Sequence, residues 1–395
     1  MNRRLPFFAL VPVFAASVTR AGAPLVLGER LQFPSKVMGE ERTLFVSVPD
    51  SYTRGTGTYP VLYLTDAETQ FEHTTATAAF LARNGFMPEI IVVGVKNTDR
   101  TRDLSPSHDP KFPTSGGADR FLDFIEKELV PFVESRYRTA PFRIFAGHSA
   151  GGLFALHAMR AKPGLFQAVI AVSPWLVWDE RKELRLLAPF VSGDGVKTRA
   201  LFLASGGEGH DLNDVLAQLS SALGKSTSKG LRWARATYPE ENHGSVVLRS
   251  HYAALRMIFD GWALPVDPET ERIVASLDDV KKHYADLSER FGWNVRPPEV
   301  AVNRLGYQEL ERNIPLAISF FRFNAETYPE SANVHDSLGE ALEKSGALED
   351  ALRSYEKAED LGARNGDPYA GVFRANADRV KARLAAKAME KTTRP

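Results

Sequence analysis

The fold is decided by the segment Arg143-Ile144-Phe145-Ala146-Gly147-His148-Ser149-Ala150-Gly151-Gly152. A short apolar run precedes its Gly-x-Ser-x-Gly pattern, and residues 153–159 follow with spacing typical of a helix. In such a pattern the small residues let the chain make a strained turn from a strand into a helix, which pushes the serine hydroxyl out. The order of strand, turn and helix therefore predicts that Ser149 is an exposed nucleophile.

Short apolar runs on both sides of this segment alternate with longer helical patterns. The predicted strands are 60–65, 90–95, 143–146, 168–172, 200–204 and 231–238, and amphipathic helices are predicted at 119–137 and 245–262. Two alternating segments between residues 31 and 50, with a turn at Gly39-Glu40, predict an antiparallel hairpin at a sheet edge. This rhythm predicts an α/β fold with a mostly parallel central sheet.

The chain becomes helical after Leu264-Pro265-Val266-Asp267-Pro268, because proline removes a backbone donor and disfavours helix in the residue before it. Beyond this point two segments superimpose at a period of about 33 to 34 residues, so that Gly306 matches Gly339 and Phe321 matches Tyr355. They look like tetratricopeptide repeats, with 376–389 as a capping helix. Two such repeats are fewer than the roughly three that are stable alone, so we expect them to dock on the preceding domain.

A chain of 395 residues exceeds one ordinary domain, and we predict three parts. Residues 1–23 are basic, then apolar, then small, which is the order of an export signal and predicts a periplasmic or secreted protein. The alternative is an uncleaved N-terminus. Residues 24–265 form the α/β domain, and residues 266–395 form a helical linker with the repeats and their cap.

The composition excludes several classes of function. Lys and Arg together number 49, as do Asp and Glu, so no net charge attracts the chain to nucleic acid or to an anionic membrane surface. The chain has no cysteine, which excludes thiolate nucleophiles and Cys-ligated metals. Beyond the N-terminus no run reaches the roughly 18 to 20 apolar residues that span a bilayer. Metal-ligand spacings, phosphate loops and dinucleotide patterns are also absent, so we expect a reaction without metal or cofactor.

A serine nucleophile needs a general base and an orienting acid. Of the nine histidines, His243 alone lies between the last predicted strand and the last helix of the α/β domain, so it is the predicted base. The acid is expected after the strand 200–204. We favour Glu208 because it is closest to the strand end, with Asp211 as the alternative, although Asp211 could also cap the next helix. Asp179 remains open as a third candidate.

Backbone donors must stabilise the oxyanion that forms during attack on an ester. One predicted donor is the N–H of Ala150, directly after the nucleophile. The other is expected in the loop after the strand that ends near Asp66, at the backbone of Ala67 or Glu68.

These segments resemble the esterase family of α/β-hydrolases that contains the enterochelin-type siderophore esterases and esterase D, and relatives of the mycobacterial mycolyltransferases. The resemblance covers residues 32–262. It is carried by Ser35-Lys36-Val37, Arg42-Thr43, Tyr59-Pro60-Val61-Leu62-Tyr63-Leu64, Arg100-Thr101-Arg102-Asp103-Leu104, Gly147-His148-Ser149-Ala150-Gly151-Gly152, Ser173-Pro174-Trp175 and His243-Gly244-Ser245. It implies an α/β-hydrolase fold and, in the most similar members, export and a helical repeat tail. The chain departs from many relatives at Ala67, where they have glycine.

Several side chains are candidates for substrate binding. Phe71, Trp175 and Trp178 could form an acyl or aromatic wall, and His148 adjoins the nucleophile. Arg100 and Arg102 could bind an anionic or catecholate group through their planar donors. The alternative is that the tryptophans are core residues and that Arg102 pairs with Asp103.

The sequence therefore predicts a serine carboxylic ester hydrolase that acts through an acyl-enzyme on Ser149, and the resemblance implies siderophore-type or small acyl esters as substrates. The first alternative is acyl transfer to an alcohol at the same site. The second is a non-catalytic hydrolase scaffold whose tail recruits a protein partner. The expected ligands are a small-molecule ester and, through the helical tail, a protein.

Overall fold

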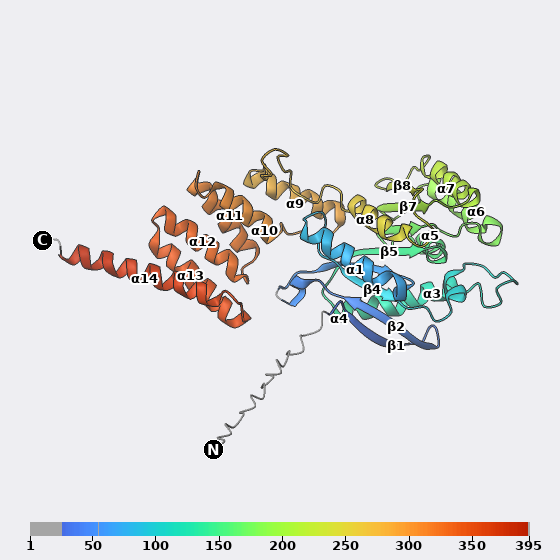
Figure 1. The fold of residues 1–395 in the computed structure, drawn as a ribbon, viewed down its shortest axis with the longest axis horizontal. Helices are drawn as coiled ribbons and strands as arrows, with labels where there is room; N and C mark the ends of the chain where they lie inside the picture. Colours follow the sequence, from blue (N-terminus) through green and yellow to red (C-terminus); the bar gives the residue numbers. More distant parts are fainter. Residues whose placement is uncertain (1–25, 54, 394–395) are drawn as a thin grey trace, which may run out of the picture.

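A single eight-stranded sheet forms the centre of the molecule (Figure 1). The computed structural model describes residues 26–53 and 55–393, so the predicted export signal at 1–23 lies outside the described residues. The strand order is β1-β2-β4-β3-β5-β6-β7-β8. The strands are β1 (Glu29–Ser35), β2 (Glu40–Ser47), β3 (Tyr59–Leu64), β4 (Ile91–Val95), β5 (Thr139–His148), β6 (Ala168–Val172), β7 (Ala200–Gly206) and β8 (Arg232–Tyr238). Only β1 with β2 and β2 with β4 pair antiparallel, and the other neighbours are parallel.

Helices cover both faces of this sheet, which explains why its central strands are continuous apolar runs. One face is covered by α3 (Ala118–Phe124), a π-helical turn (Ile125–Leu129), α4 (Val130–Arg136), α5 (Ala150–Ala161), α6 (Trp178–Ser192) and α7 (His210–Leu223). The other face is covered by α1 (Ala67–Arg83), α8 (Val246–Ile258) and α9 (Leu277–Phe291). A short helix, α2 (Arg100–Leu104), and a 3-10 turn (Asp50–Thr53) complete the domain. This is the α/β-hydrolase architecture.

The predicted strands and the edge hairpin are confirmed, with shifts of a few residues at some ends. The helix predicted over 119–137 is present as α3, the π-helical turn and α4 in direct succession. The helix predicted over 245–262 is shorter, since α8 ends at Ile258.

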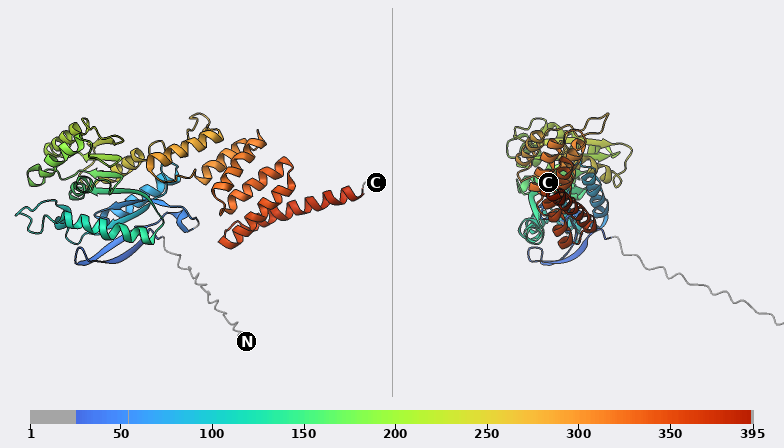
Figure 2. Two further views of the ribbon diagram at one scale, coloured as in Figure 1. Left: turned by 180° about the vertical axis from the view of Figure 1, so that it is seen from behind. Right: turned by 90° about the vertical axis from the view of Figure 1, so that its left-hand side faces the viewer.

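The C-terminal region is a row of packed helices that extends from one end of the sheet domain (Figures 1 and 2). These helices are α10 (Glu299–Glu309), α11 (Ile314–Thr327), α12 (Ala332–Ser345), α13 (Leu348–Asn365) and α14 (Ala370–Thr393). The two glycines matched in the sequence have equivalent surroundings. A Cβ on Gly306 would lie 2.5 Å from the ring of Phe321, and one on Gly339 would lie 2.7 Å from the ring of Tyr355. In each helix pair, a glycine of the first helix therefore packs against an aromatic ring of the second.

The tail and the sheet domain share one apolar core. The cluster that begins beneath α1 and α8 continues without a break to Phe291, Val302 and Phe320. The sequence-based boundary near Leu264 therefore falls between two elements that are packed in the same core. The first tail helices are docked on the sheet domain, as the low repeat number predicts.

A buried ion pair joins the edge hairpin to α2. It lies next to the turn from β5 into α5 that carries Ser149, which we call the elbow. Arg42 Nη1 donates to Asp103 Oδ2 over 2.7 Å, and both side chains are 1% exposed. Removing Arg42 takes away the buried partner of the Asp103 carboxylate and leaves it only the partly exposed Arg102, so part of a buried charge loses its compensation. We expect Arg42→Ala to lower the free energy of unfolding by about 3 to 5 kcal/mol. Lys127→Ala removes a surface pair with Asp123 and should cost less than about 1 kcal/mol.

Urea unfolding followed by circular dichroism measures both variants. A loss in Arg42→Ala no larger than that in Lys127→Ala would mean that the buried pair contributes nothing.

Candidate active site

Ser149 occupies the tip of a strained turn between β5 and α5. Its φ of 59° and ψ of −116° are unusual for a residue with a side chain. Glycine is required on both sides, because a Cβ on Gly147 would lie 2.0 Å from the carbonyl oxygen of Gly151. A Cβ on Gly151 would lie 2.3 Å from Thr65 Oγ1. The glycines of the pattern are therefore explained by sterics at this turn.

Backbone hydrogen bonds hold this strained turn in place. The Ser149 N–H donates to the carbonyl of Val172 over 2.9 Å. The Ser149 carbonyl accepts from the N–H groups of Leu153 and Trp175, each over 3.0 Å. The turn is thus tied to β6, to its own helix and to the loop after β6, which fixes the direction of the serine side chain.

His243 and Glu208 meet at the edge of the sheet that also carries Ser149. His243 Nδ1 lies 2.5 Å from Glu208 Oε1, and the ring of His243 lies 4.6 Å from the ring of His148, the residue before Ser149. Glu208 follows β7 and is held by the N–H of Gly206, which donates to its Oε2 over 3.2 Å. If Nδ1–H donates to the carboxylate, Nε2 is left to accept a proton. This is the arrangement that a general base requires.

The other two candidate acids are held elsewhere. Asp211 is 88% exposed and lies 3.7 Å from Arg181, while Asp179 lies 3.5 Å from Lys182. The structure gives neither of them a hydrogen bond to His243, whereas Glu208 has one. Of the three carboxylates weighed from the sequence, Glu208 is the one placed against the histidine.

Two helix N-termini meet at the elbow and supply backbone donors. Ala150 begins α5 and Ala67 begins α1, and the first N–H groups of a helix have no partner within it. Asp66, in the left-handed region with a φ of 56°, turns the chain from β3 into α1. The Ala67 methyl points into the core, where a Cβ on Gly94 would approach it to 2.7 Å. The side chain of Ala67 is therefore accommodated by the absence of a side chain at Gly94.

The two arginines are engaged by protein groups. Arg100 Nε donates to Asp66 Oδ1 over 2.6 Å, and its Nη2 donates to the carbonyl of His148 over 3.2 Å. Arg102 Nη2 donates to Glu40 Oε1 over 2.5 Å and its Nε to Asp103 Oδ1 over 2.7 Å. The hydrogen bond from Arg102 is the main cause that lowers the pKa of Glu40. Arg102 thus belongs to the ion-pair network of the edge hairpin, which is the alternative considered for it, and Arg100 orders the loop before α1.

The predicted aromatic wall is only partly present. Phe71 is 7% exposed and packs edge-on against Phe45 with the ring centroids 5.6 Å apart. This side of α1 faces the sheet, so Phe71 is a core residue and its assignment to the wall is wrong. Trp175 and Trp178 do adjoin, with ring centroids 4.8 Å apart, but Trp178 is 4% exposed and is a core residue, which is the alternative considered for it.

Phe112 was missed from the sequence. It lies 5.9 Å from Trp175 and 5.1 Å from Trp178 and is 37% exposed. The signal available was a lone aromatic residue in the proline-rich loop between α2 and α3.

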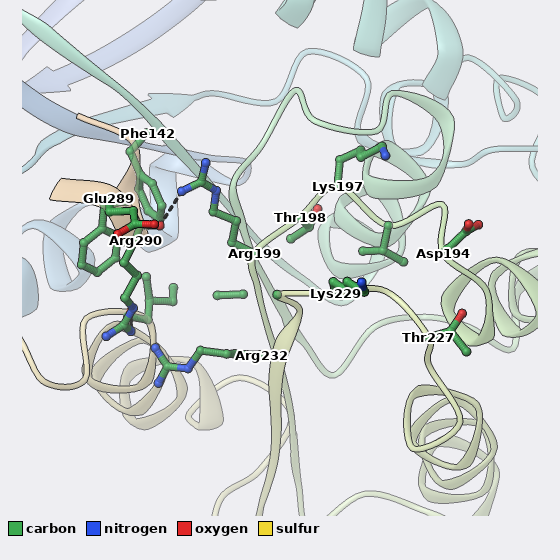
Figure 3. Close-up of a pocket in the computed structure, with 15 residues that line it drawn as sticks. Phe142, Asp194, Lys197, Thr198, Arg199, Thr227, Lys229, Arg232, Glu289 and Arg290 are labelled. Carbon is green, nitrogen blue, oxygen red and sulfur yellow. Dashed lines mark hydrogen bonds between the residues drawn. The ribbon is translucent and has the colours of Figure 1, made fainter. Parts of the chain in front are cut away.

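A cavity of about 970 Å³ lies at the opposite, amino-terminal edge of β7 and β8 (Figure 3). Arginines on its rim cap helix ends. Arg290 donates to the carbonyls of Asp260 and Ile258 at the end of α8, and Arg199 donates to the carbonyl of Arg290 at the end of α9. Cations at helix C-termini are stabilising there. The arginines of this cavity therefore fasten the tail to the sheet domain, away from Ser149.

The described part of the chain contains neither a metal-ligand cluster nor a membrane-spanning helix. Its histidine, aspartate and glutamate side chains form no cluster of three that could hold a metal ion. None of the helices described in the structure has both the length and the apolar character needed to cross a bilayer.

A serine on a strained strand-to-helix turn, with a histidine and a carboxylate at the same sheet edge, defines a serine hydrolase of the α/β-hydrolase class. Residues 35–243 match the family described as "Putative esterase", and the chain belongs to this family. It is a serine esterase.

The relatives and solved structures agree with this assignment. The chain is 33% identical to the ferri-bacillibactin esterase BesA of Bacillus subtilis over 53% of this chain and 82% of that protein. It is 30% identical to a siderophore triacetylfusarinine C esterase of Aspergillus fumigatus over 57% of this chain and 90% of that protein. An IroE-like serine hydrolase from Shewanella oneidensis superimposes with a TM-score of 0.66 at 32% identity, covering 74% of this chain and 98% of that one.

A further solved structure resembles the whole architecture. An uncharacterised protein from Capnocytophaga ochracea superimposes with a TM-score of 0.60 at 19% identity and covers 90% of this chain and 99% of that one. At this identity the likeness concerns the fold alone. Because the match covers 90% of this chain, it includes part of the helical tail as well as the sheet domain.

Proposed function

We propose that this esterase hydrolyses siderophore-type carboxylic esters through an acyl-enzyme on Ser149. The observation that carries the proposal is the hydrogen bond of His243 Nδ1 to Glu208 Oε1, 2.5 Å long, at the sheet edge that also bears the elbow. In this mechanism Ser149 attacks the ester carbonyl while His243 Nε2 takes the hydroxyl proton. The protonated His243 then gives that proton to the leaving alcohol, and water releases the acyl group by the same steps in reverse.

Glu208 and the two helix N-termini have the remaining roles. Glu208 keeps the His243 tautomer in which Nδ1 carries a proton and stabilises the charged ring without taking the proton itself. The N–H groups of Ala150 and Ala67 donate to the oxygen that becomes negative in the tetrahedral intermediate. Both groups begin helices, so the helix dipoles favour that negative charge as well.

The siderophore part of the proposal is supported by the relatives and by the aromatic cluster. Both relatives described above are named as esterases of siderophores. Trp175 and Phe112 present aromatic surface in the loops after β6 and α2, and such surface suits the flat rings of catecholate groups. Arg100 retains a 39% exposed side chain in the same region, which can face an anionic substrate while it holds Asp66.

A direct comparison of substrates tests this assignment. Ferri-bacillibactin, triacetylfusarinine C and p-nitrophenyl butyrate are each incubated with the protein, and the products are followed by chromatography. We expect kcat/KM for one siderophore to exceed that for the simple ester by about 100-fold, since about 3 kcal/mol of additional binding to the larger substrate accounts for this factor. Hydrolysis of the simple ester alone would refute the siderophore assignment while leaving the esterase intact.

We also propose that the tail is a tetratricopeptide-like module that binds a protein partner. The matching glycine contacts in α10–α11 and α12–α13 support the repeat assignment. A hollow of about 350 Å³ lies between α11, α12 and α13, with Leu338 and Leu342 among its lining residues and Arg322 and Lys357 at its edge. Export through residues 1–23, and so a periplasmic or secreted location, is part of the same proposal and rests on the sequence alone.

A further inference from the structure

Histidine rings form two pairs in this domain, one of them next to Ser149. His148 ends β5, His251 is on α8, and His73 is on α1. The rings of His148 and His243 are 4.6 Å apart, and those of His251 and His73 are 5.5 Å apart. Three nitrogens of these side chains, His148 Nε2, His251 Nε2 and His73 Nδ1, are buried without a hydrogen-bond partner among the described residues. Buried polar groups without partners cost free energy, so their presence here calls for an explanation.

His148 and His251 are uncharged at neutral pH. Burial, with the nearby charge of His243 as the second cause, lowers the pKa of His148 to about 4, whereas a hydrogen bond to the His243 backbone and the charge of Asp66 raise it and Arg100 lowers it. Burial, with smaller contributions from the neighbouring His73 and His148, lowers the pKa of His251 to about 3. Neither ring can therefore supply a proton to substrate in the neutral range.

His243 is less constrained than a general base should be. Its side chain is 53% exposed, and the hydrogen bond to Glu208 holds the ring only at Nδ1. A ring fixed at one atom can still swing about that atom. The ring of His148, tilted by 47° to the ring of His243, restricts this swing from a second direction.

His148 is itself fixed and can act as a support. It pairs with Val172 of β6, and its carbonyl accepts from Arg100 Nη2 over 3.2 Å. On the α8 side, Thr74 Oγ1 donates to the carbonyl of Gln70 over 2.6 Å. Thr74 Oγ1 therefore accepts from His251 Nδ1, 2.9 Å away, which fixes the position of His251.

We propose that His148 is a positioning residue that holds the ring of His243 through ring contact. The inference rests on the proposed role of His243 as the base. A ring is required at position 148, and its nitrogens are not.

The test compares His148→Ala and His148→Gln, which remove the ring, with His148→Phe, which keeps a ring without nitrogen atoms. For p-nitrophenyl butyrate we expect kcat to fall by about 10- to 100-fold in the first two with KM nearly unchanged, since misplacement of a catalytic group by about 1 Å has effects of this size. In His148→Phe we expect kcat to stay within about threefold of the wild type, which is below 1 kcal/mol. The midpoint of the acid limb of kcat/KM should not move in any variant, because no charge near His243 is added or removed.

The controls separate this inference from the proposed function. His335→Ala, in the tail, should leave kcat unchanged. If Ser149→Ala and His243→Ala remain active, the proposed function itself fails. If these two are inactive but His148→Ala and His148→Gln keep kcat within twofold, only the positioning role is refuted. A folded His148→Phe as slow as His148→Ala, or a shifted acid limb, would instead assign a chemical role to the nitrogens of His148.

Discussion

Ser149→Ala is expected to lower kcat for p-nitrophenyl butyrate by at least about 10⁴-fold, because loss of a serine nucleophile removes the covalent route altogether. The remaining rate would come from oxyanion stabilisation and substrate binding alone. KM should change little, since the hydroxyl contributes mainly to the transition state. Stopped and continuous assays at enzyme concentrations in the micromolar range would resolve this residual rate.

The matched control is Ser220→Ala on α7, whose hydroxyl donates to the carbonyl of Leu216 within its own helix. It should retain full activity. Ser149→Ala that is folded and keeps more than about one hundredth of the wild-type kcat would contradict a nucleophilic role, because a removed nucleophile costs far more than this factor.

The second large effect is expected at the histidine–carboxylate pair. His243→Ala removes the base and should lower kcat by about 10⁴- to 10⁶-fold, comparable with the loss of the nucleophile. Glu208→Gln keeps the size of the side chain but can stabilise neither the imidazolium nor the required tautomer, so we expect a loss of about 10³- to 10⁴-fold. Steady-state kinetics with a simple ester measures both.

Asp211→Asn distinguishes the two candidate acids. Its carboxylate is 88% exposed and lies near Arg181 instead of His243, so its kcat should stay within about threefold of the wild type, a difference below 1 kcal/mol. If Asp211→Asn were the more damaging of the two carboxylate variants, the acid would have been misassigned and the loop after β7 would have to rearrange during catalysis.

The strands and the elbow could be predicted because their signals are local. Each central strand is a buried apolar run, and the Gly-x-Ser-x-Gly turn is explained by contacts of Gly147 and Gly151 within their immediate surroundings. The positions of Glu208 and His243 could also be predicted, since parallel strands bring the loops after their carboxyl ends to one sheet edge. Chain order alone then placed an acid and a histidine near Ser149.

The substrate-binding residues could not be predicted in the same way, because their partners are distant in sequence. Arg102 is bound by Glu40 across the edge hairpin, and nothing near Arg102 in the sequence indicates that contact. Phe71 was misassigned because the direction of a helical side chain depends on how α1 is rotated against the sheet. The ring contact between His148 and His243 likewise arises only when the end of β5 and the loop after β8 meet at one sheet edge.

We propose that Ser149 forms a covalent intermediate in an active site that also contains His243 and Glu208. The most direct measurement is mass spectrometry of the protein after treatment with a fluorophosphonate, followed by peptide mapping. We expect one adduct per chain, located on the peptide that contains Ser149, with labelling strongly slowed in His243→Ala. An unlabelled wild-type protein, or an adduct on any other serine, would contradict this proposal.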